Sequence, residues 1–228
     1  REYLYYDNER IAQYSFTDVG GLTDLGINFG RSAQLRAGYL YSSRKADVDT
    51  GPRVLPEVEA VDAGITAQFV YDTRDAAFAP TRGLAATVEY MYTDDSLGAD
   101  RDWQRLEAGA RFALPLRGDV IWLAAAGGSN LGSDLPPDRF FTLGGPGSFP
   151  GLELAQYRAP EYWTVSGSYL WKFADIQTLR GESMYIGAQI QGGAIANWLK
   201  GLQIGPDGPD FESVDDPQLE PIYGGSLY

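Results

Sequence analysis

The chain has 228 residues and a formal net charge of −13, with no cysteine and no histidine. The acidic balance argues against a nucleic-acid partner, because phosphates are neutralised by Lys and Arg. The lack of cysteine excludes a disulfide framework and thiol chemistry. The lack of histidine removes the commonest general base and metal ligand. We therefore expect no catalytic residues, no metal site and no cofactor.

Alternation of apolar and polar residues dominates the chain, as expected for β-strands with two different faces. It is clear in segments 35–44, 61–72, 84–93, 105–116, 163–173 and 184–191. About ten strands are predicted: 9–19, 22–30, 33–45, 58–73, 84–94, 103–116, 119–130, 162–173, 184–198 and 221–228. Residues 2–6 make an eleventh, joined by a turn at Asp7 and Asn8.

The strands are long, and Tyr and Trp cluster near the ends of their apolar faces. This arrangement is typical of a lipid-facing band in an outer-membrane barrel. No uncharged apolar run reaches about 18 residues, so a transmembrane helix is not expected. The pattern predicts an all-β protein, a transmembrane antiparallel β-barrel in the bacterial outer membrane. A soluble β-sandwich is the rival fold.

The polar faces of these strands are predicted to line a hydrated lumen. The lumen side chains would be Arg36, Arg44, Glu89, Arg105, Glu107, Arg111, Gln189 and Gln191. They could line a polar path or form a paired network that fills it, and the sequence leaves both open.

Connections alternate in length, with long ones at 46–57, 94–102, 131–160 and 198–220. Barrels of the outer membrane have short periplasmic turns and long outer loops. The short connection expected at Gly20 and Gly21 is an exception to this alternation. Within the longest loop, residues 139–152 combine four glycines with three phenylalanines, a composition that suits an ordered loop with tight bends.

Two segments carry a family resemblance: residues 71–83, Tyr-Asp-Thr-Arg-Asp-Ala-Ala-Phe-Ala-Pro-Thr-Arg-Gly, and residues 141–152, Phe-Thr-Leu-Gly-Gly-Pro-Gly-Ser-Phe-Pro-Gly-Leu. Their order and spacing resemble the bacterial surface antigen superfamily, which includes the outer-membrane insertase, two-partner secretion transporters and patatin-like autotransporter barrels. The resemblance implies a fragment of a sixteen-stranded barrel over 1–228, truncated at both ends. It also implies that loop 131–160 folds into the lumen.

The resemblance places a functional motif at the loop tip: Gly144, Gly145, Gly147, Phe149, Pro150 and Gly151. Insertases and two-partner transporters carry Val-Arg-Gly-Phe/Tyr here, whose Arg pairs with an acid inside the barrel. This chain has Pro150 in place of that Arg, and the facing strand offers the neutral Gln189 and Gln191. The difference favours the patatin-like branch, as does the tail that ends in Asn197 and Trp198.

Catalytic motifs are missing from the sequence. The glycines at 144–147 lack the Gly-Lys-Ser/Thr ending of a P-loop, and no Gly-x-Ser-x-Gly nucleophile motif is present. Asp72, Arg74 and Asp75 are interpreted as a structural clamp of one hairpin. The acidic segment 207–216 lacks the spacing of a calcium loop, so we expect it to be solvated.

The predicted function is an outer-membrane barrel that anchors or translocates a passenger domain of the patatin-like lipase type. The alternatives are a general insertase or two-partner transporter barrel, and an enzyme with its site on the barrel. The expected partners are outer-membrane lipid and a covalently linked or translocated passenger protein. A homo-oligomer is left open, and any lipase activity would belong to an upstream domain.

Overall fold

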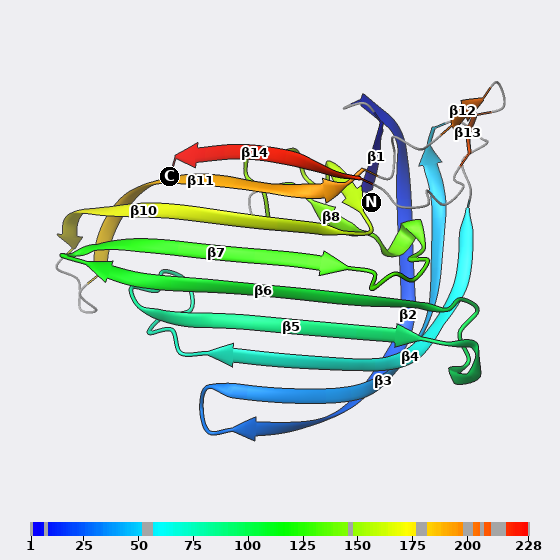
Figure 1. The fold of residues 1–228 in the computed structure, drawn as a ribbon, viewed down its shortest axis with the longest axis horizontal. Coiled ribbons are helices and arrows are strands. Elements are labelled where there is room, and N and C mark those ends of the chain that lie inside the picture. The colour runs from blue at the N-terminus through cyan, green and yellow to red at the C-terminus, as the bar shows by residue number, and fades with distance from the viewer. Residues whose placement is uncertain are drawn as a thin grey trace.

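A computed structural model describes residues 2–6, 9–51, 57–145, 148–176, 182–197, 203–205, 208–210 and 218–227. Ten strands form one antiparallel sheet in the order β1-β2-β3-β4-β5-β6-β7-β10-β11-β14 (Figure 1). The strands are β1 (Glu2–Tyr6), β2 (Glu9–Phe29), β3 (Ala33–Thr50), β4 (Val58–Asp72), β5 (Gly83–Thr93), β6 (Trp103–Leu116), β7 (Asp119–Ser129), β10 (Tyr162–Ile176), β11 (Glu182–Ala196) and β14 (Leu219–Leu227). Within the described residues, β1 and β14 are the two edges of the sheet. The predicted all-β fold is confirmed.

The predicted break at Gly20 and Gly21 is wrong, because β2 runs without interruption from Glu9 to Phe29. Neither glycine has a positive φ. A Cβ on Gly20 would lie 2.3 Å from the carbonyl oxygen of Tyr41 on β3. The glycine therefore permits close approach of the neighbouring strand instead of forming a turn. The correction also removes the one exception to the alternation of short and long connections.

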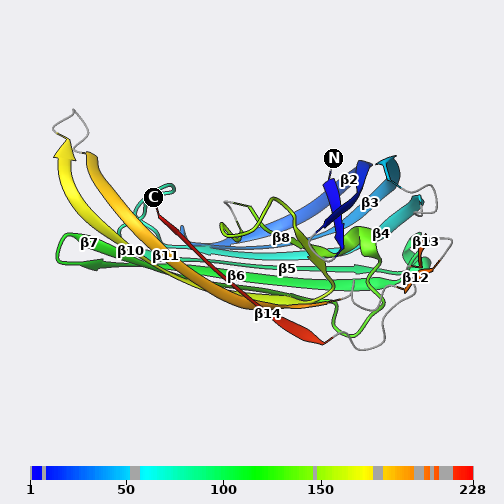
Figure 2. The ribbon, with the colours of Figure 1, turned by 90° about the horizontal axis from the view of Figure 1, so that it is seen from above.

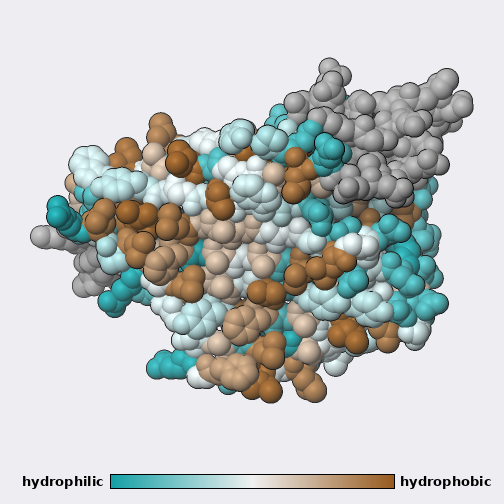
Figure 3. Space-filling view, in the orientation of Figure 1, coloured by the Kyte–Doolittle hydropathy of each residue, from teal (hydrophilic) through white to brown (hydrophobic). Residues whose placement is uncertain are grey.

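The sheet is curved, and its two faces differ in chemistry. Large apolar side chains are exposed along the convex face, among them Leu25, Phe69, Leu123, Trp171 and Ile186. Figure 3 shows apolar groups spread over this face, while polar groups gather at the end with the long loops. An apolar face left exposed in an isolated sheet is what a lipid-facing surface requires.

The connection between β7 and β10 lies over the concave face (Figure 2). It contains η2 (Pro137–Arg139), β8 (Phe141–Leu143) and β9 (Tyr157–Ala159), and β8 pairs with β9. The largest buried apolar cluster forms between this connection and the sheet: Trp103, Leu135, Phe140, Phe141, Leu143, Phe149, Ala159, Ile195, Ala196 and Ile222. The core of the protein therefore lies on the lumen side, around the loop.

The remaining elements are η1 (Asp95–Leu97) and the hairpin of β12 (Gln203–Gly205) with β13 (Gly208–Asp210). Within the described ranges, no helix is both long and apolar enough to cross a membrane, a finding that does not bear on crossing by strands.

Candidate functional site

The base of the inward loop is held by a cluster of charged side chains around Asp62 of β4. Asp62 is fully buried, at 0% exposure. Its Oδ2 accepts from Nε of Arg139 at 2.9 Å and its Oδ1 accepts from the indole N–H of Trp103 at 2.9 Å. Arg101 lies 3.4 Å from the same carboxylate. One carboxylate therefore joins the loop to β4 and to the start of β6.

The cluster continues outward through alternating charges. Nη1 of Arg101 donates to Oδ1 of Asp138 at 2.7 Å. Nε of Arg44, on β3, lies 3.1 Å from Asp138, and Nη1 of Arg44 donates to Asp18 of β2 at 2.7 Å. We name as the base cluster Asp18, Arg44, Asp62, Arg101, Asp138 and Arg139. Its three guanidinium groups and three carboxylates balance, which is the condition under which buried charges are tolerated.

Of the base cluster, Arg44 was predicted from the sequence as a lumen side chain, and Asp62 at its centre was not. Asp62 belongs to the polar face predicted for residues 61–72, and Arg139 opens the stretch singled out in the longest loop. The two are 77 positions apart, and no spacing rule connects a strand residue with a loop residue at that separation.

A second attachment lies beside β8 and uses an aromatic ring. Phe141 packs under the guanidinium of Arg105, 4.1 Å from the ring centroid, and its ring lies 5.2 Å from that of Tyr162. Nη2 of Arg105 donates to Glu107 at 2.9 Å, and the hydroxyl of Tyr162 donates to Glu107 at 2.7 Å. A Cβ on Gly128 would lie 2.5 Å from the Phe141 ring, so β7 provides a glycine where the ring docks.

In the described part of the loop tip, residues 144–145 and 148–151, the contacts with the sheet are an amide hydrogen bond and apolar packing. Nε2 of Gln191, on β11, donates to the carbonyl oxygen of Ser148 at 2.7 Å. Phe149 is fully buried, and a Cβ on Gly224 of β14 would lie 2.7 Å from its ring. Gly151 approaches the same strand, where its own Cβ would lie 3.2 Å from Cα of Gly224. The glycines of β14 interrupt its apolar pattern. At Gly224 the missing side chain leaves the space that the tip residues Phe149 and Gly151 occupy.

The other predicted tip residues have simpler settings. Gly144 and Gly145 have φ of 124° and 88°, conformations that favour glycine. Pro150 lines a cavity of about 500 Å³ together with Gln189 and Gln191. Gly147 lies outside the described residues.

Most of the predicted lumen side chains are paired. Arg36 forms an ion pair with Asp24 at 2.7 Å, and Glu89 accepts from Nε2 of Gln68 at 2.7 Å. Nε2 of Gln189 donates to Oε1 of Gln191 at 3.1 Å. Arg111 has no side-chain partner within the described part of the chain and lines the 500 Å³ cavity. The concave face is thus a largely paired polar surface with room beneath the loop.

The predicted hairpin clamp consists of two separate contacts. Nη2 of Arg74 donates to Asp72 at 2.8 Å. Asp75 instead accepts from the hydroxyl and the backbone N–H of Thr81, and the hydroxyl bond is the main cause that lowers the pKa of Asp75. The indole N–H of Trp122 donates to the carbonyl oxygen of Pro80 at 2.8 Å. The short connection at 73–82 is therefore an ordered structure.

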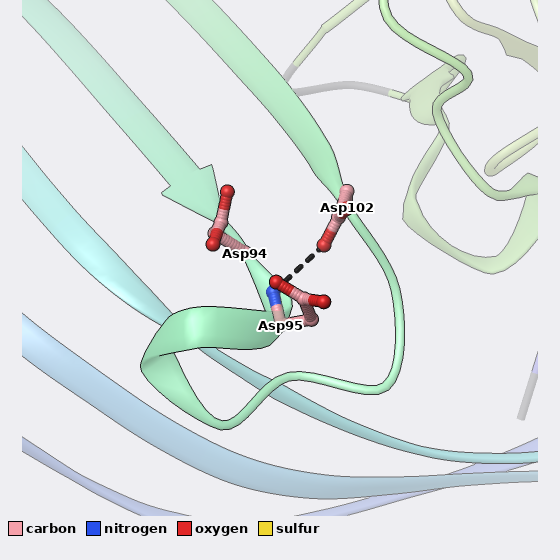
Figure 4. A group of neighbouring side chains, drawn as sticks. All are labelled: Asp94, Asp95 and Asp102. Atoms are coloured by element: carbon pink, nitrogen blue, oxygen red, sulfur yellow. Dashed lines mark hydrogen bonds between the residues drawn. The ribbon is translucent and has the colours of Figure 1, made fainter.

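Three carboxylates lie close together in the β5–β6 connection: Asp94, Asp95 and Asp102 (Figure 4). The carboxylates of Asp94 and Asp102 have a local structural role. The carboxylate of Asp94 accepts from the backbone N–H of Ser96 and from the hydroxyl of Tyr92, while Asp102 accepts from the backbone N–H of Asp95 at 2.8 Å. The Ser96 hydroxyl is the first cause that lowers the pKa of Asp94, to about 2. The group organises its own turn.

A curved antiparallel sheet with an exposed apolar convex face and a long loop on its concave face is the architecture of an outer-membrane β-barrel. The chain belongs to the Omp85 superfamily, because the model of the Omp85 superfamily domain matches residues 1–186. The resemblance to the surface antigen barrels and the location in the bacterial outer membrane are therefore confirmed. Barrels of this family are in general not enzymes, and they handle protein substrates that are inserted or translocated.

The fold is similar to that in "The crystal structure of BamA from Haemophilus ducreyi lacking POTRA domains 1-3", with a TM-score of 0.68 and 13% sequence identity. The similarity covers 94% of this chain and 55% of that chain, so this chain spans about half of the similar structure. At this identity the likeness concerns the fold. No curated protein sequence matches the chain.

Proposed function

We propose that this barrel anchors or translocates a passenger protein at the outer membrane, and that the passenger is a domain of the patatin-like lipase type. The observation that carries the proposal is the uncharged attachment of the loop tip. Ser148 and Phe149 meet Gln191 and Gly224. By the family resemblance, Pro150 takes the place of the motif Arg of insertases and two-partner transporters. We take the lack of this Arg to mark a barrel that serves one passenger and not many different substrates.

The loop is proposed to stabilise the barrel by filling its lumen. It is attached at its base through ions, beside β8 through an aromatic ring, and at its tip through apolar contact. The barrel itself performs no catalysis in this proposal, and any lipase activity belongs to the passenger. Removal of residues 144–151 is expected to lower the yield of folded barrel, because the buried Phe149 would be lost with the tip contact.

The experiment compares two readouts between cells that make the full-length protein and cells that make the same protein without residues 144–151. One is surface exposure of a passenger domain, followed by protease accessibility in intact cells. The other is the assembly of unrelated outer-membrane barrels, followed by their heat-modifiable migration. The proposal expects loss of passenger exposure while other barrels assemble normally. A general assembly defect would identify an insertase instead, and an unchanged passenger would refute the proposal.

A further inference from the structure

Three arginines are left without partners at the end of the sheet that carries the short connections. Arg31 lies between β2 and β3, Arg82 precedes β5, and Arg117 lies between β6 and β7. All three are exposed. Within the described residues, none of their side chains forms a hydrogen bond or an ion pair. We name them the rim arginines.

The carboxylates at the same end are already satisfied. Asp72 pairs with Arg74, and Asp75 caps its own loop through Thr81. Asp119, beside Arg117, accepts from the backbone N–H of Lys172 at 2.9 Å. The connections at 73–82 and 117–118 therefore combine an unpaired guanidinium with carboxylates that are occupied elsewhere, and the connection at 30–32 has Arg31 and no carboxylate. This end of the sheet therefore attracts anions.

The opposite end has the reverse character. Exposed acidic side chains gather there, on β3, β4 and the long connections: Asp49, Glu57, Glu59, Asp95, Asp100, Asp102 and Asp134. The whole chain is acidic, at −13. Net charge therefore does not account for the three arginines at one end, which have no side-chain partner among the residues that the structure describes.

The rim arginines also border the apolar convex face. Phe29, two residues before Arg31, is 54% exposed, and Leu116, next to Arg117, is 44% exposed. The three connections follow every second strand (Figure 1), so neighbouring rim positions are spaced by roughly 10 Å, twice the distance between strands. A partner that meets an apolar surface and presents anions at its edge is a phospholipid.

We propose that the rim arginines bind the phosphates of anionic phospholipids in the leaflet at the short-connection end of the barrel. Guanidinium groups donate paired N–H groups in a geometry that matches phosphate oxygens. The acyl chains would lie against the apolar face beside Phe29 and Leu116. The inference rests on the outer-membrane location of the chain, and it is independent of the passenger.

The test uses the full-length protein in nanodiscs that contain phosphatidylcholine with a minor fraction of phosphatidylglycerol. Native mass spectrometry of the released protein measures which lipid is retained. The variants are Arg31→Gln, Arg82→Gln, Arg117→Gln and their triple combination. Arg111→Gln is the matched control, because it removes one equally unpaired guanidinium from the lumen face instead of the rim. Heat-modifiable migration verifies that each variant is folded.

Each single rim variant is expected to weaken the preference for phosphatidylglycerol by roughly fivefold, and the triple variant by on the order of a hundredfold. Arg111→Gln should leave the preference unchanged. Equal loss in the control would overturn the proposal, since charge alone would then suffice. A folded triple variant that keeps the preference but loses a co-purifying acidic protein would also overturn it, and would assign the rim to a protein partner.

Discussion

The substitution Asp62→Asn tests whether the base cluster holds the inward loop in place. The change keeps the size of the side chain and removes the buried negative charge that Arg139 and Arg101 share. Two guanidinium groups would then remain beside a neutral amide with little access to water. Removing one partner of a buried ion pair costs about 3–5 kcal/mol, so the full-length protein should unfold more easily by that amount.

Arg139→Gln should cost less than Asp62→Asn. In that variant Asp62 keeps Arg101 and the indole N–H of Trp103 as partners. The double variant should be less destabilised than the sum of the two singles, because it leaves neither member of the pair unmatched. Asp134→Asn is the matched control, since it lies in the same loop but is exposed, and it should change stability by less than about 0.5 kcal/mol.

The assay is unfolding in urea after reconstitution in lipid, followed by tryptophan fluorescence and heat-modifiable migration. With a slope of roughly 2–3 kcal/mol per molar urea, the midpoint for Asp62→Asn should fall by about 1–2.5 M. Equal midpoints for Asp62→Asn and Asp134→Asn would contradict a loop base held by buried ion pairs. A double variant of Asp62→Asn with Arg139→Gln that loses the full sum of the two single effects would contradict a direct pairing of these residues.

Three further predictions concern the remaining contacts. Gly128→Ala should destabilise the protein by about 1–3 kcal/mol, because the new Cβ meets a buried ring; Gly109→Ala, whose Cβ has only ordinary contacts, should be close to neutral in the same urea assay. Protease protection of the loop should weaken in Pro150→Arg and in Gln191→Glu. The double variant creates an Arg–carboxylate pair and should recover the protection. Equal protease sensitivity of all three variants would contradict this. The lowered pKa of Asp94, about 2 against a usual 3.8, stabilises its turn at a pH above 3.8, and this contribution is lost as the pH falls towards 2. Pepsin cleavage of residues 94–102 should therefore rise over that range relative to Asp94→Asn, and parallel profiles would contradict the assignment.

The strands could be predicted from sequence because alternation is a local property. The clearest segments, such as 61–72 and 105–116, repeat it over about ten residues, and the exposed apolar face confirms the assignment. The turn predicted at Gly20 is wrong because glycine serves both in turns and where two strands approach closely. Without the neighbouring strand, a glycine that admits the carbonyl oxygen of Tyr41 cannot be distinguished from one that forms a turn.

The candidate site was predictable only in part, because its contacts join distant segments. Gln191 was expected near the loop tip from the family resemblance, and its side chain does reach Ser148. The docking of Phe149 on Gly224 was not predicted, because no local pattern connects a loop phenylalanine with a glycine of a distant strand. A glycine that leaves space for a side chain can be recognised only when the side chain that fills the space is known.

The three attachments of the loop also differ in how they respond to their surroundings. The base cluster is electrostatic and buried, so salt should screen it weakly. The tip relies on apolar contact with β14. A movement of β14 would therefore remove the packing contact of Phe149 with Gly224, while the contact of Arg139 with Asp62 would remain. The structure thus gives the loop a fixed base on β2, β3 and β4 and a tip whose attachment depends on β11 and β14, and any opening of the lumen should begin at the tip.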